Sequence, residues 1–464
     1  MSKKGDFYPA KTKKSSSIVE AKKSFERFFE QPGNSGKSSV WVAGRVVGIL
    51  DDGFVLQDES GRMDLVYGEA VNVGDIVEAR LSVKEVKGPE GKSFFVYPAD
   101  ELNVMAPCRD DFFIRKTDPN WKKTVIDIRR RDLMARRAAI VRKIREFFWE
   151  RGFEEAETPL MVRRPGMEPH LDPFKTVLTG QPSEGRAAPT EGMYLITSPE
   201  YALKKMLVAG YEKIFQLGKS FRNRETAGAL HNPEFTMLEW YRAYADYSDI
   251  MKDTEEMVNF LAREMCGGAL VKYGGREVDT KTPWPRVRVK DLFKEYAGVD
   301  EETLLDAELL RAVAGKKGYK VGPDTPYEDL FYLIFMNEIE PRLGMDKPVI
   351  VFDYPLQLGA LAKRSEAYPR YAERFEVYIA GVELCNAYTE LNDPVEQESR
   401  LKAEREKRIG MGKDNYPVDQ SFIGALKFGM PPSGGNALGA DRLAMILTGT
   451  EDINDIMLFP LRDL

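Results

Sequence analysis

The run FRNRETAGALHNPEFTMLE, residues 221–239, contains side chains whose types and spacing suit phosphate chemistry. Arg222 follows an expected strand, and a Gly/Ala loop leads to a return strand with His231 and Phe235 four residues apart. An arginine stabilises charge that develops on a phosphate, a histidine can reach further phosphates, and a phenylalanine ring can stack under adenine. The run therefore predicts a hairpin that binds ATP, with Glu225 in its loop as a further ATP-binding residue.

A second run, GMPPSGGNALGADRLAMIL at residues 429–447, places small residues before a helix expected to begin near Asp441. Arg442 would then face the nucleotide from the side opposite Arg222. A Gly-rich turn before a helix is by itself a common structural device. Combined with the first run, it predicts a nucleotide held between two catalytic arginines.

A third run, ERFEVYIAGVELCNAYTELND at residues 373–393, predicts a pocket for an ammonium group. Alternation along a strand puts Asn386, Tyr388 and Glu390 on one face. A carboxylate and an aromatic ring together suit an ammonium group, and Glu200 would supply a second carboxylate. Solvated surface acids are the ordinary alternative, but these lie in a block otherwise poor in charge. The pocket predicts lysine over asparagine or aspartate.

Short alternating runs in the front third of the chain indicate a small barrel that precedes these residues. Trp41 and Phe54 could stack on bases there, although such aromatic residues more often belong to a core. The expected strands cover residues 40–49, 53–58, 62–67, 75–83 and 93–99. Five short strands in this span are typical of a closed barrel.

Behind the barrel, an Arg-rich helix is expected from Asp127 to Trp149, with Gly152 near its end. A strand should follow beside Pro159, then mixed strands and helices, a less patterned insert at about 267–345, and a strand-rich block. The arginines of the helix predict either a nucleic-acid or acidic-protein partner or only a solvated helix face. Residues 1–37 form a basic tail with a short amphipathic helix near residues 18–29.

Composition excludes several kinds of protein. The chain is 43% hydrophobic and 31% charged, which is typical of a globular protein. Three scattered cysteines and two histidines indicate neither a disulfide framework nor a zinc site, and they exclude a His-based triad. No apolar run is long enough to cross a bilayer, so we expect a cytoplasmic protein without a membrane partner.

With Pro159, the first two runs resemble the three signature motifs of class II aminoacyl-tRNA synthetases, in the order that this class has them. The front strands are similar to the oligonucleotide-binding (OB) barrel of class IIb members. The resemblance implies an α+β fold with an antiparallel sheet flanked by helices, and a homodimer paired through the strand at Pro159. The implied domains are the basic tail at 1–37, an OB-type barrel at 38–106, and a catalytic domain at 127–464 with the insert at 267–345.

The third run resembles the lysine pocket of the lysyl-tRNA synthetase group. This likeness implies that Glu376 and Glu383 hold Mg²⁺ against the ATP phosphates, with Glu383 also an ATP-binding residue. The lysine-binding set implied is Glu200, Asn386, Tyr388, Glu390 and Ala437.

The acceptor of the activated lysine separates two branches of this group. Four features look like the ligases that attach lysine or β-lysine to elongation factor P: the runs HLDPF at 170–174, SPEY at 198–201 and EWYR at 239–242, and Ala437. A methyl group at Ala437 alters the space near the substrate amino group. We therefore expect the protein acceptor, with tRNA(Lys) as the alternative that the front barrel favours. A non-catalytic paralogue is a third interpretation, and the complete set of ATP-binding residues argues against it.

Overall fold

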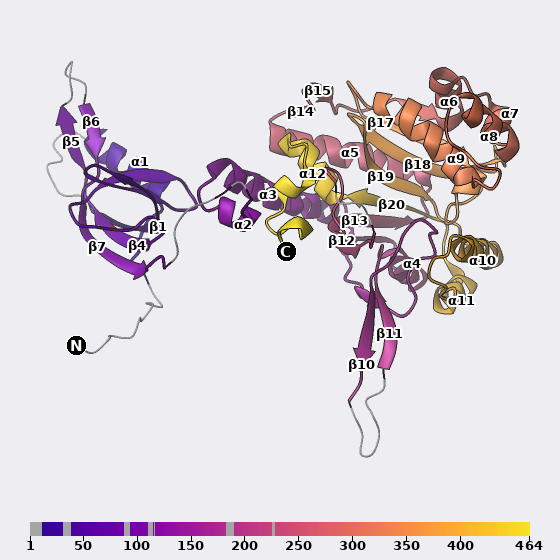
Figure 1. Cartoon of the computed structure of the whole chain (residues 1–464), viewed down its shortest axis with the longest axis horizontal. Helices are drawn as coiled ribbons and strands as arrows, with labels where there is room; N and C mark the ends of the chain where they lie inside the picture. Colours follow the sequence, from indigo (N-terminus) through magenta and orange to yellow (C-terminus); the bar gives the residue numbers. More distant parts are fainter. Residues whose placement is uncertain are drawn as a thin grey trace. The chain divides into compact units, whose positions relative to one another are not determined.

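The computed structural model describes residues 12–30, 39–87, 93–109, 115, 117–181, 190–224 and 228–464. The chain divides into two compact units, Met1–Asp132 and Leu133–Leu464, both drawn in Figure 1. Within the described ranges, no helix is long and apolar enough to cross a membrane.

The smaller unit is built on a five-stranded antiparallel sheet in the order β3-β2-β1-β4-β7. Its strands are β1 (Val40–Leu50), β2 (Gly53–Gln57), β3 (Arg62–Val66), β4 (Ile76–Leu81) and β7 (Ala99–Ala106). A parallel bridge between Val66 and Pro98, with Val66 N donating to Tyr97 O at 3.1 Å, brings the start of β7 beside the end of β3. The sheet therefore curls back on itself.

The fifth strand of this sheet is not the predicted one. Residues 93–99 were expected to close the barrel, but β6 (Ser93–Val96) instead pairs with β5 (Lys84–Lys87) in a separate hairpin. The side chains of β5 are all exposed, so this hairpin contributes little to a core. The run ADELNVMA, which lacks regular alternation, forms β7 because it completes the ladder along β4.

The core of the smaller unit contains the inward side chains of the sheet and one face of α1 (Ile18–Glu30). Ile18 and Phe25 of this helix are buried against the sheet. Phe54 is fully buried in the same core, so the proposed stacking of Phe54 on bases is wrong. Trp41 remains partly exposed, with Lys13 Nζ 4.3 Å from the centre of its ring.

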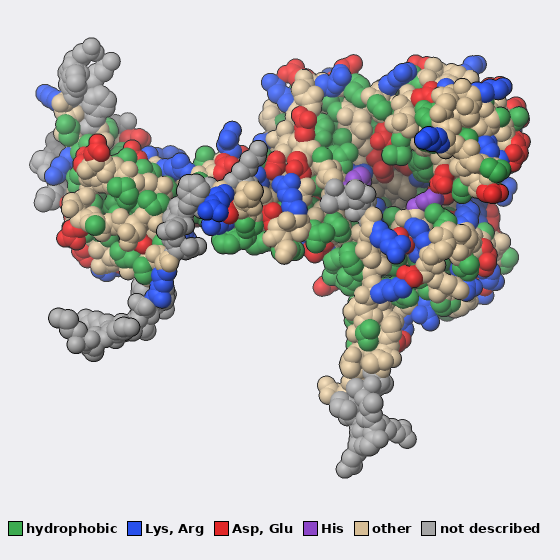
Figure 2. Space-filling model, viewed as in Figure 1, with side chains coloured by type: hydrophobic (Ala, Val, Ile, Leu, Met, Phe, Trp, Pro, Cys, Tyr) green, Lys and Arg blue, Asp and Glu red, His purple; other side chains and the backbone are tan. Residues whose placement is uncertain are grey.

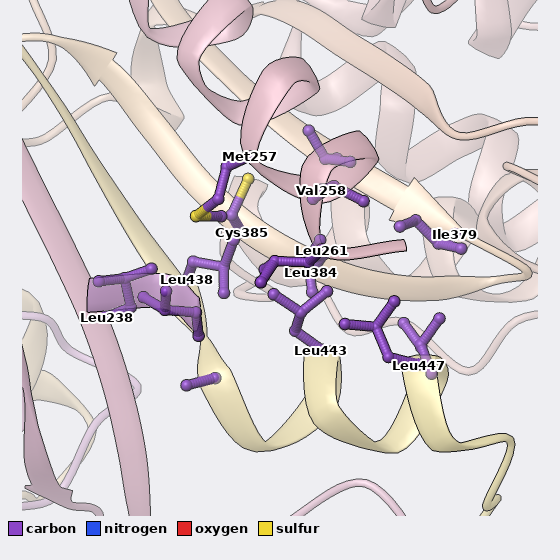
Figure 3. Packing of buried hydrophobic residues seen from close by; sticks show 14 of the residues in the cluster. Leu238, Met257, Val258, Leu261, Ile379, Leu384, Cys385, Leu438, Leu443 and Leu447 are labelled. Carbon is purple, nitrogen blue, oxygen red and sulfur yellow. The ribbon is translucent and has the colours of Figure 1, made fainter. Parts of the chain in front are cut away.

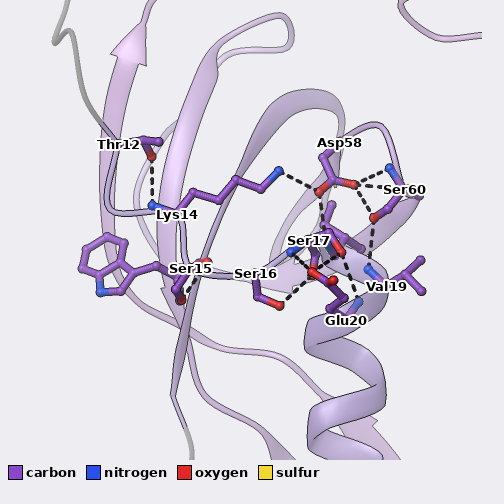
Figure 4. Close-up of polar contacts among 12 residues, drawn as sticks. Thr12, Lys14, Ser15, Ser16, Ser17, Val19, Glu20, Asp58 and Ser60 are labelled. Carbon is purple, nitrogen blue, oxygen red and sulfur yellow. Dashed lines mark hydrogen bonds and ion pairs between the residues drawn. The ribbon is translucent and has the colours of Figure 1, made fainter.

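The segment before α1 is held on the sheet by polar contacts (Figure 4). Lys14 Nζ lies 3.1 Å from Asp58 Oδ2, and the same oxygen accepts from Ile18 N at 3.0 Å. Glu78 accepts from Thr12 Oγ1 at 2.8 Å. The described part of the basic tail therefore uses its lysines and turn residues to attach itself to acids of its own unit.

The larger unit is built on an eight-stranded sheet in the order β16-β17-β18-β19-β20-β13-β12-β8 (Figure 1). The pairs β16–β17 and β12–β8 are parallel and the remaining pairs are antiparallel. The strands are β8 (Glu154–Glu155), β12 (Lys213–Phe221), β13 (Glu234–Ala243), β16 (Arg286–Arg288), β17 (Val349–Pro355), β18 (Tyr371–Ile379), β19 (Val382–Thr389) and β20 (Ser433–Gly439).

Helices α3 (Ile128–Glu150), α5 (Tyr247–Cys266) and α12 (Ala440–Thr448) contribute to one hydrophobic core with this sheet. Figure 3 shows side chains of α5 and α12 packed on side chains of the central strands. The labelled residues are Leu238, Met257, Val258, Leu261, Ile379, Leu384, Cys385, Leu438, Leu443 and Leu447. The central strands are thus fixed from one face, which leaves the other face free to carry polar side chains.

The strand predicted beside Pro159 is two short strands. β8 pairs with β12, whereas β9 (Met161–Val162) pairs with β11 (Thr190–Leu195) and so with β10 (Lys175–Thr179). Pro159 lies between them and has no N–H to donate to a ladder, which accounts for the interruption.

The other elements of the larger unit include the helices of the insert. The insert packs its own hydrophobic cluster against β17 and Tyr378. These elements are α4 (Glu200–Val208), α6 (Val289–Ala297), α7 (Glu301–Leu304), α8 (Ala307–Lys316), α9 (Tyr327–Ile334), α10 (Pro394–Gly410), α11 (Gln420–Gly429), β14 (Leu270–Tyr273) and β15 (Arg276–Asp279), with short 3₁₀ or π turns elsewhere. Helix α2 (Asn120–Lys123) belongs to the smaller unit.

Candidate active site

A cavity of about 670 Å³ lies in the larger unit. Figure 2 shows a hollow on this unit with the purple histidine side chains beside it. Ten of the residues predicted from the sequence line the cavity: Glu200, Arg222, His231, Phe235, Glu376, Glu383, Asn386, Tyr388, Ala437 and Arg442. Glu225 lies outside the described residues, and Glu390 is buried behind the wall.

One end of the cavity carries the cationic side chains of the first two runs. The Arg222 guanidinium lies 5.0 Å from the centre of the Phe235 ring. Arg442 Nη2 is 2.7 Å from His231 Nε2, and Arg442 Nη1 donates to Glu383 O at 2.9 Å. The hairpin β12–β13 and helix α12, about 200 residues apart in the sequence, thus place two arginines and a histidine on one site. Such a set suits a polyphosphate beside an aromatic ring.

Helix α12 is fixed at its first turn by Asp441. Its carboxylate accepts from Thr236 N at 2.6 Å and from Arg137 Nη2 at 2.6 Å. Because Asp441 is buried and tied both to β13 and to α3, the neighbouring Arg442 is held in a defined position.

A buried lysine of the chain itself lies between two of the acids predicted to bind the substrate. Lys204 Nζ lies 2.5 Å from Glu200 Oε1 and 2.5 Å from Glu390 Oε2. The Tyr388 hydroxyl also donates to Glu200 Oε1, at 2.6 Å. Burial lowers the pKa of Lys204, but the two carboxylates raise it further, so the net pKa is above its usual value. Glu200 and Glu390, the two acids predicted to hold a substrate ammonium, therefore already share the ammonium group of Lys204.

Glu239 is a further buried acid near Glu200 and Lys204. It accepts from Ser198 Oγ at 2.6 Å and from the Tyr241 hydroxyl at 2.9 Å. Burial and the Glu200 charge raise the pKa of Glu239 to about 8. Its side chain is therefore protonated over much of the neutral range.

Ala437 lies at the point where three strands bring this site together. On β20 it pairs with Glu239 of β13 on one side and with Asn386 of β19 on the other. Asn386 is oriented by Arg374, whose Nε donates to Asn386 Oδ1 at 2.9 Å. Asn386 also lines the cavity.

Glu376 and Glu383, predicted to hold Mg²⁺, differ in their surroundings. Glu376 accepts hydrogen bonds from Tyr354, Tyr378 and Arg374, each at 2.6 Å. Glu383 is more exposed and lies 3.4 Å from Arg442. In the described part of the chain, no group of three or more His, Cys, Asp or Glu side chains is arranged to hold a metal ion.

Glu340 joins these two acids from the insert. Burial and the charges of Glu383 and Glu376 raise its pKa to about 7. Its carboxyl lines the same cavity. The excess of acid at this point favours a cation that would accompany a bound polyphosphate.

Sequence reasoning missed Lys204, Arg374 and Glu340 as parts of the site, and it noted Glu239 only as the end of the hairpin run. Lys204 was detectable in part, because it follows Glu200 by four residues and such a pair lies on one helix face. Arg374 precedes Glu376 by two residues on the same strand face. Glu340 gave no signal, since nothing in its local sequence indicates that the insert turns toward the cavity.

The comparisons with known proteins agree with this geometry. Residues 117–463 match the family of class II tRNA synthetases (D, K and N). The chain is 36% identical over 457 residues to a lysine–tRNA ligase of Moorella thermoacetica, covering 94% of this chain and 90% of the relative. It is 40% identical over 334 residues to that of Clostridium tetani, covering 71% and 64%. It is 32% identical over 479 residues to lysine–tRNA ligase 2 of Methanosarcina acetivorans, covering 98% and 90%.

Proposed function

The chain belongs to the class II tRNA synthetases of the D, K and N group, and from this premise we propose that it transfers lysine to tRNA. It is a lysine-activating ligase that uses ATP. The observation that carries the tRNA acceptor is the extent of the match to lysine–tRNA ligases, which reaches 94% of the chain and so includes the front unit. The sequence pattern alone favours a protein acceptor, and the relatives favour tRNA.

In the activation step, the lysine carboxylate attacks the α-phosphorus of ATP and pyrophosphate leaves. The attacking carboxylate is already ionised, so no general base is required. Arg222 neutralises charge on the α-phosphate, Phe235 stacks with the adenine, and His231 and Arg442 contact the distal phosphates from the other side. The acceptor hydroxyl then attacks the lysyl carbonyl and AMP leaves.

The ammonium end of lysine fits the region around Glu200, Tyr388 and Glu390. Lys204 already neutralises part of this charge, so the pocket remains folded when it is empty. Asn386 and Ala437 form the wall next to it. This set of contacts is the proposed lysine site.

Mg²⁺ fits the opposite wall as a companion of the ATP phosphates. Mg²⁺ is commonly held by one or two carboxylates plus phosphate oxygens, and Glu383 and Glu340 are available for that role. Glu376 is better described as their support, since its carboxylate already has three donors. The ion would add positive charge beside the phosphates.

The front unit is proposed to be an OB-type barrel that contacts the acceptor. Its five-stranded meander and the parallel closure through Val66 and Pro98 support this assignment. Homodimerisation is proposed through the surface near Pro159, where Leu160 and Met161 are exposed. Size-exclusion chromatography with light scattering tests the dimer, and a monomer mass would contradict it.

A second acceptor, a lysine of elongation factor P, is kept because of Ala437. The Ala437 methyl group belongs to the strand position that pairs with Asn386 on one side and Glu239 on the other. The proposal is that a substrate amino group binds next to this position. If this space selects β-lysine, the protein acceptor becomes the better proposal.

The test supplies purified enzyme with ATP and labelled lysine or β-lysine, and offers tRNA(Lys) and elongation factor P side by side. We expect label on tRNA, with lysine preferred. Arg442→Ala serves as the negative control and should lower the transfer rate ~100-fold or more. Label on elongation factor P with β-lysine preferred would replace the tRNA proposal by the protein-ligase one.

A further inference from the structure

Arg374 is a buried cation on the cavity wall that the proposed mechanism has not used. Its backbone in β18 pairs with Tyr388 of β19, and Glu376, two residues later, pairs with Asn386. Side chains two residues apart on a strand lie on one face of the sheet, and residues paired across two strands share that face. Arg374 therefore lies on the face that carries both the proposed lysine-site residues and Glu376.

The guanidinium of Arg374 joins the two proposed ligand sites directly. Its Nε donates to Asn386 Oδ1 at 2.9 Å, on the lysine side. Its Nη2 donates at 2.6 Å to Glu376 Oε1, the acid that supports the proposed phosphate side. Because a guanidinium is planar and donates in fixed directions, a movement that changes one of these bonds also changes the other.

Further contacts from three segments of the chain hold this guanidinium. Its Nη1 donates to Leu358 O at 2.7 Å, and its Nη2 lies 3.3 Å from the Tyr332 hydroxyl of α9 in the insert. The Tyr354 ring of β17 has its centre 4.5 Å from the guanidinium carbon. Leu358 and Tyr332 also line the cavity. A ligand that orders these segments therefore also orders Arg374.

A group that two ligands both order makes each ligand bind more tightly in the presence of the other. The first ligand bears the entropic cost of fixing the shared group, and the second binds to a group that is already fixed. Lysine would lie on the Asn386 side of the guanidinium and the ATP phosphates on the Glu376 side. Arg374 is the side chain that both ligands would fix.

We propose that Arg374 is a positioning residue that couples lysine binding to ATP binding, because one guanidinium sets both the Asn386 amide and the Glu376 carboxylate. This inference rests on the proposed function and adds a link between its two sites. It also explains the choice of side chain. A lysine would supply a charge to Glu376 but lacks the rigid fork of donors that reaches both partners.

Calorimetry with an unreactive ATP analogue measures this link without turnover. We choose α,β-methylene-ATP with MgCl₂, since its methylene bridge is not cleaved to release pyrophosphate. The ratio of its Kd without lysine to its Kd at saturating lysine is the coupling factor. We expect a factor of roughly 10 or more in the unaltered enzyme and less than about 2 in Arg374→Lys, whatever Kd each ligand has alone.

Arg400→Lys is the matched control. Arg400 Nη1 donates to Gly359 O and to Ala362 O, in the loop that Arg374 also reaches. Among the described residues, its hydrogen bonds hold this loop and its own helix α10 and not the two side chains that Arg374 joins. Its coupling factor should stay within about twofold of the unaltered value. Loss of coupling in both variants would assign the effect to the loop and overturn the role of Arg374.

The outcomes separate this inference from the proposed function. Absence of lysine-dependent pyrophosphate exchange in the unaltered enzyme would overturn the function and the inference with it. Normal exchange there, with no coupling in the unaltered enzyme or with coupling retained in Arg374→Lys, would overturn only the role of Arg374.

A second variant keeps the test decisive if Arg374→Lys does not fold. The double variant with Arg374→Met and Glu376→Gln removes both partners of the buried ion pair, so it leaves neither of them as an unpaired charge. Its coupling factor should also fall below about 2, and a retained factor would contradict the inference.

Discussion

Lys204 keeps a positive charge between two carboxylates that sequence patterns assign to a substrate ammonium. Two buried carboxylates without a cation would be strongly unfavourable, and the usual response is protonation or loss of stability. The internal ammonium solves this problem in the empty site. The substrate is then attracted by the net negative charge that the pocket has with Lys204 included. The acids beside Glu200 and Glu390 therefore decide which ammonium groups bind.

Replacement of Lys204 should therefore cost stability rather than only affinity. We expect Lys204→Met to lower the free energy of unfolding by about 3–5 kcal/mol, because Glu200 and Glu390 are left buried without their partner. Urea denaturation followed by circular dichroism measures this change. Lys205→Met, which removes a partly exposed lysine paired with Asp419, should cost less than about 1 kcal/mol. Equal midpoints for Lys204→Met and the unaltered protein would contradict the buried ion pair.

We expect Glu239 to make lysine binding depend on pH. Its pKa of about 8 means that the free enzyme carries a proton there at pH 7, and an arriving ammonium group favours the ionised form. Binding should then release up to about one proton, and lysine affinity should rise as the pH is raised from 7 to 8. Calorimetry in buffers of different ionisation enthalpy measures the released proton. Glu239→Gln should release fewer protons, and an unchanged number would exclude Glu239 as the source.

The sequence was sufficient for the residues that lie on local patterns. Arg222, His231 and Phe235 belong to one hairpin, so their spacing in the sequence is enough to predict that they lie close together. Glu390 and Lys204 lie 186 residues apart, and only the packing of α4 against the central strands shows that they pair. The cavity-lining Glu168 has a backbone fixed by Arg408, 240 residues later, which no local pattern reports.

At the scale of elements, α12 carries Arg442 to the proposed nucleotide site and is attached at both of its ends to α3. Arg137 binds Asp441 at the first turn, and Arg136 Nη2 donates to Leu447 O at 2.9 Å in the last turn. Part of the basic pattern of α3 thus serves internal contacts rather than an external partner. The sequence left both interpretations of these arginines open, because charge alone does not indicate what a guanidinium touches.

Loss of the Asp441 contacts should loosen α12 and displace Arg442. We expect Asp441→Asn to lower the free energy of unfolding by about 3 kcal/mol, since Arg137 loses its buried partner. The KM for ATP in pyrophosphate exchange should rise by roughly tenfold. Arg142→Gln on the exposed face of α3 should change neither quantity by more than about 1 kcal/mol or twofold. A stable Asp441→Asn with a normal KM would show that α12 is held by its apolar face alone.

Strands were predicted more reliably where one face is buried. The first four runs of the front unit alternate and form β1 to β4, whereas residues 93–99 alternate equally well but form an outlying hairpin. The alternation of apolar and polar residues indicates only that a segment is extended. Which strand it pairs with depends on the free backbone edge of β4, which β7 occupies. Pro159 shows the converse case, since its missing N–H interrupts a run that otherwise looks continuous.

At the scale of the whole molecule, the chain joins a unit that activates lysine to a front unit proposed to contact the acceptor. Activation needs only small ligands enclosed by the cavity, while transfer to tRNA requires contact with a polyanion. The two activities should therefore respond differently to ionic strength.

We expect transfer of lysine to tRNA to weaken steeply between 50 mM and 200 mM salt, by roughly tenfold or more in kcat/KM, because each phosphate contact releases counterions. Lysine-dependent pyrophosphate exchange should change far less over the same range. Both rates are measured on the same enzyme preparation with sodium chloride as the variable. A parallel decline of the two activities would remove the support for an electrostatic tRNA contact.

Gly435 gives the site a property that matters for inhibitor resistance. A Cβ atom there would overlap both the Glu390 carboxylate and the Tyr241 ring, so a larger residue at 435 would have to displace two buried side chains of the lysine site. An inhibitor that rests on the Gly435 backbone would thus contact a position at which any larger residue is disfavoured. Escape would have to arise elsewhere on the cavity wall, and Ala437, two residues along the same strand, is the first position to monitor.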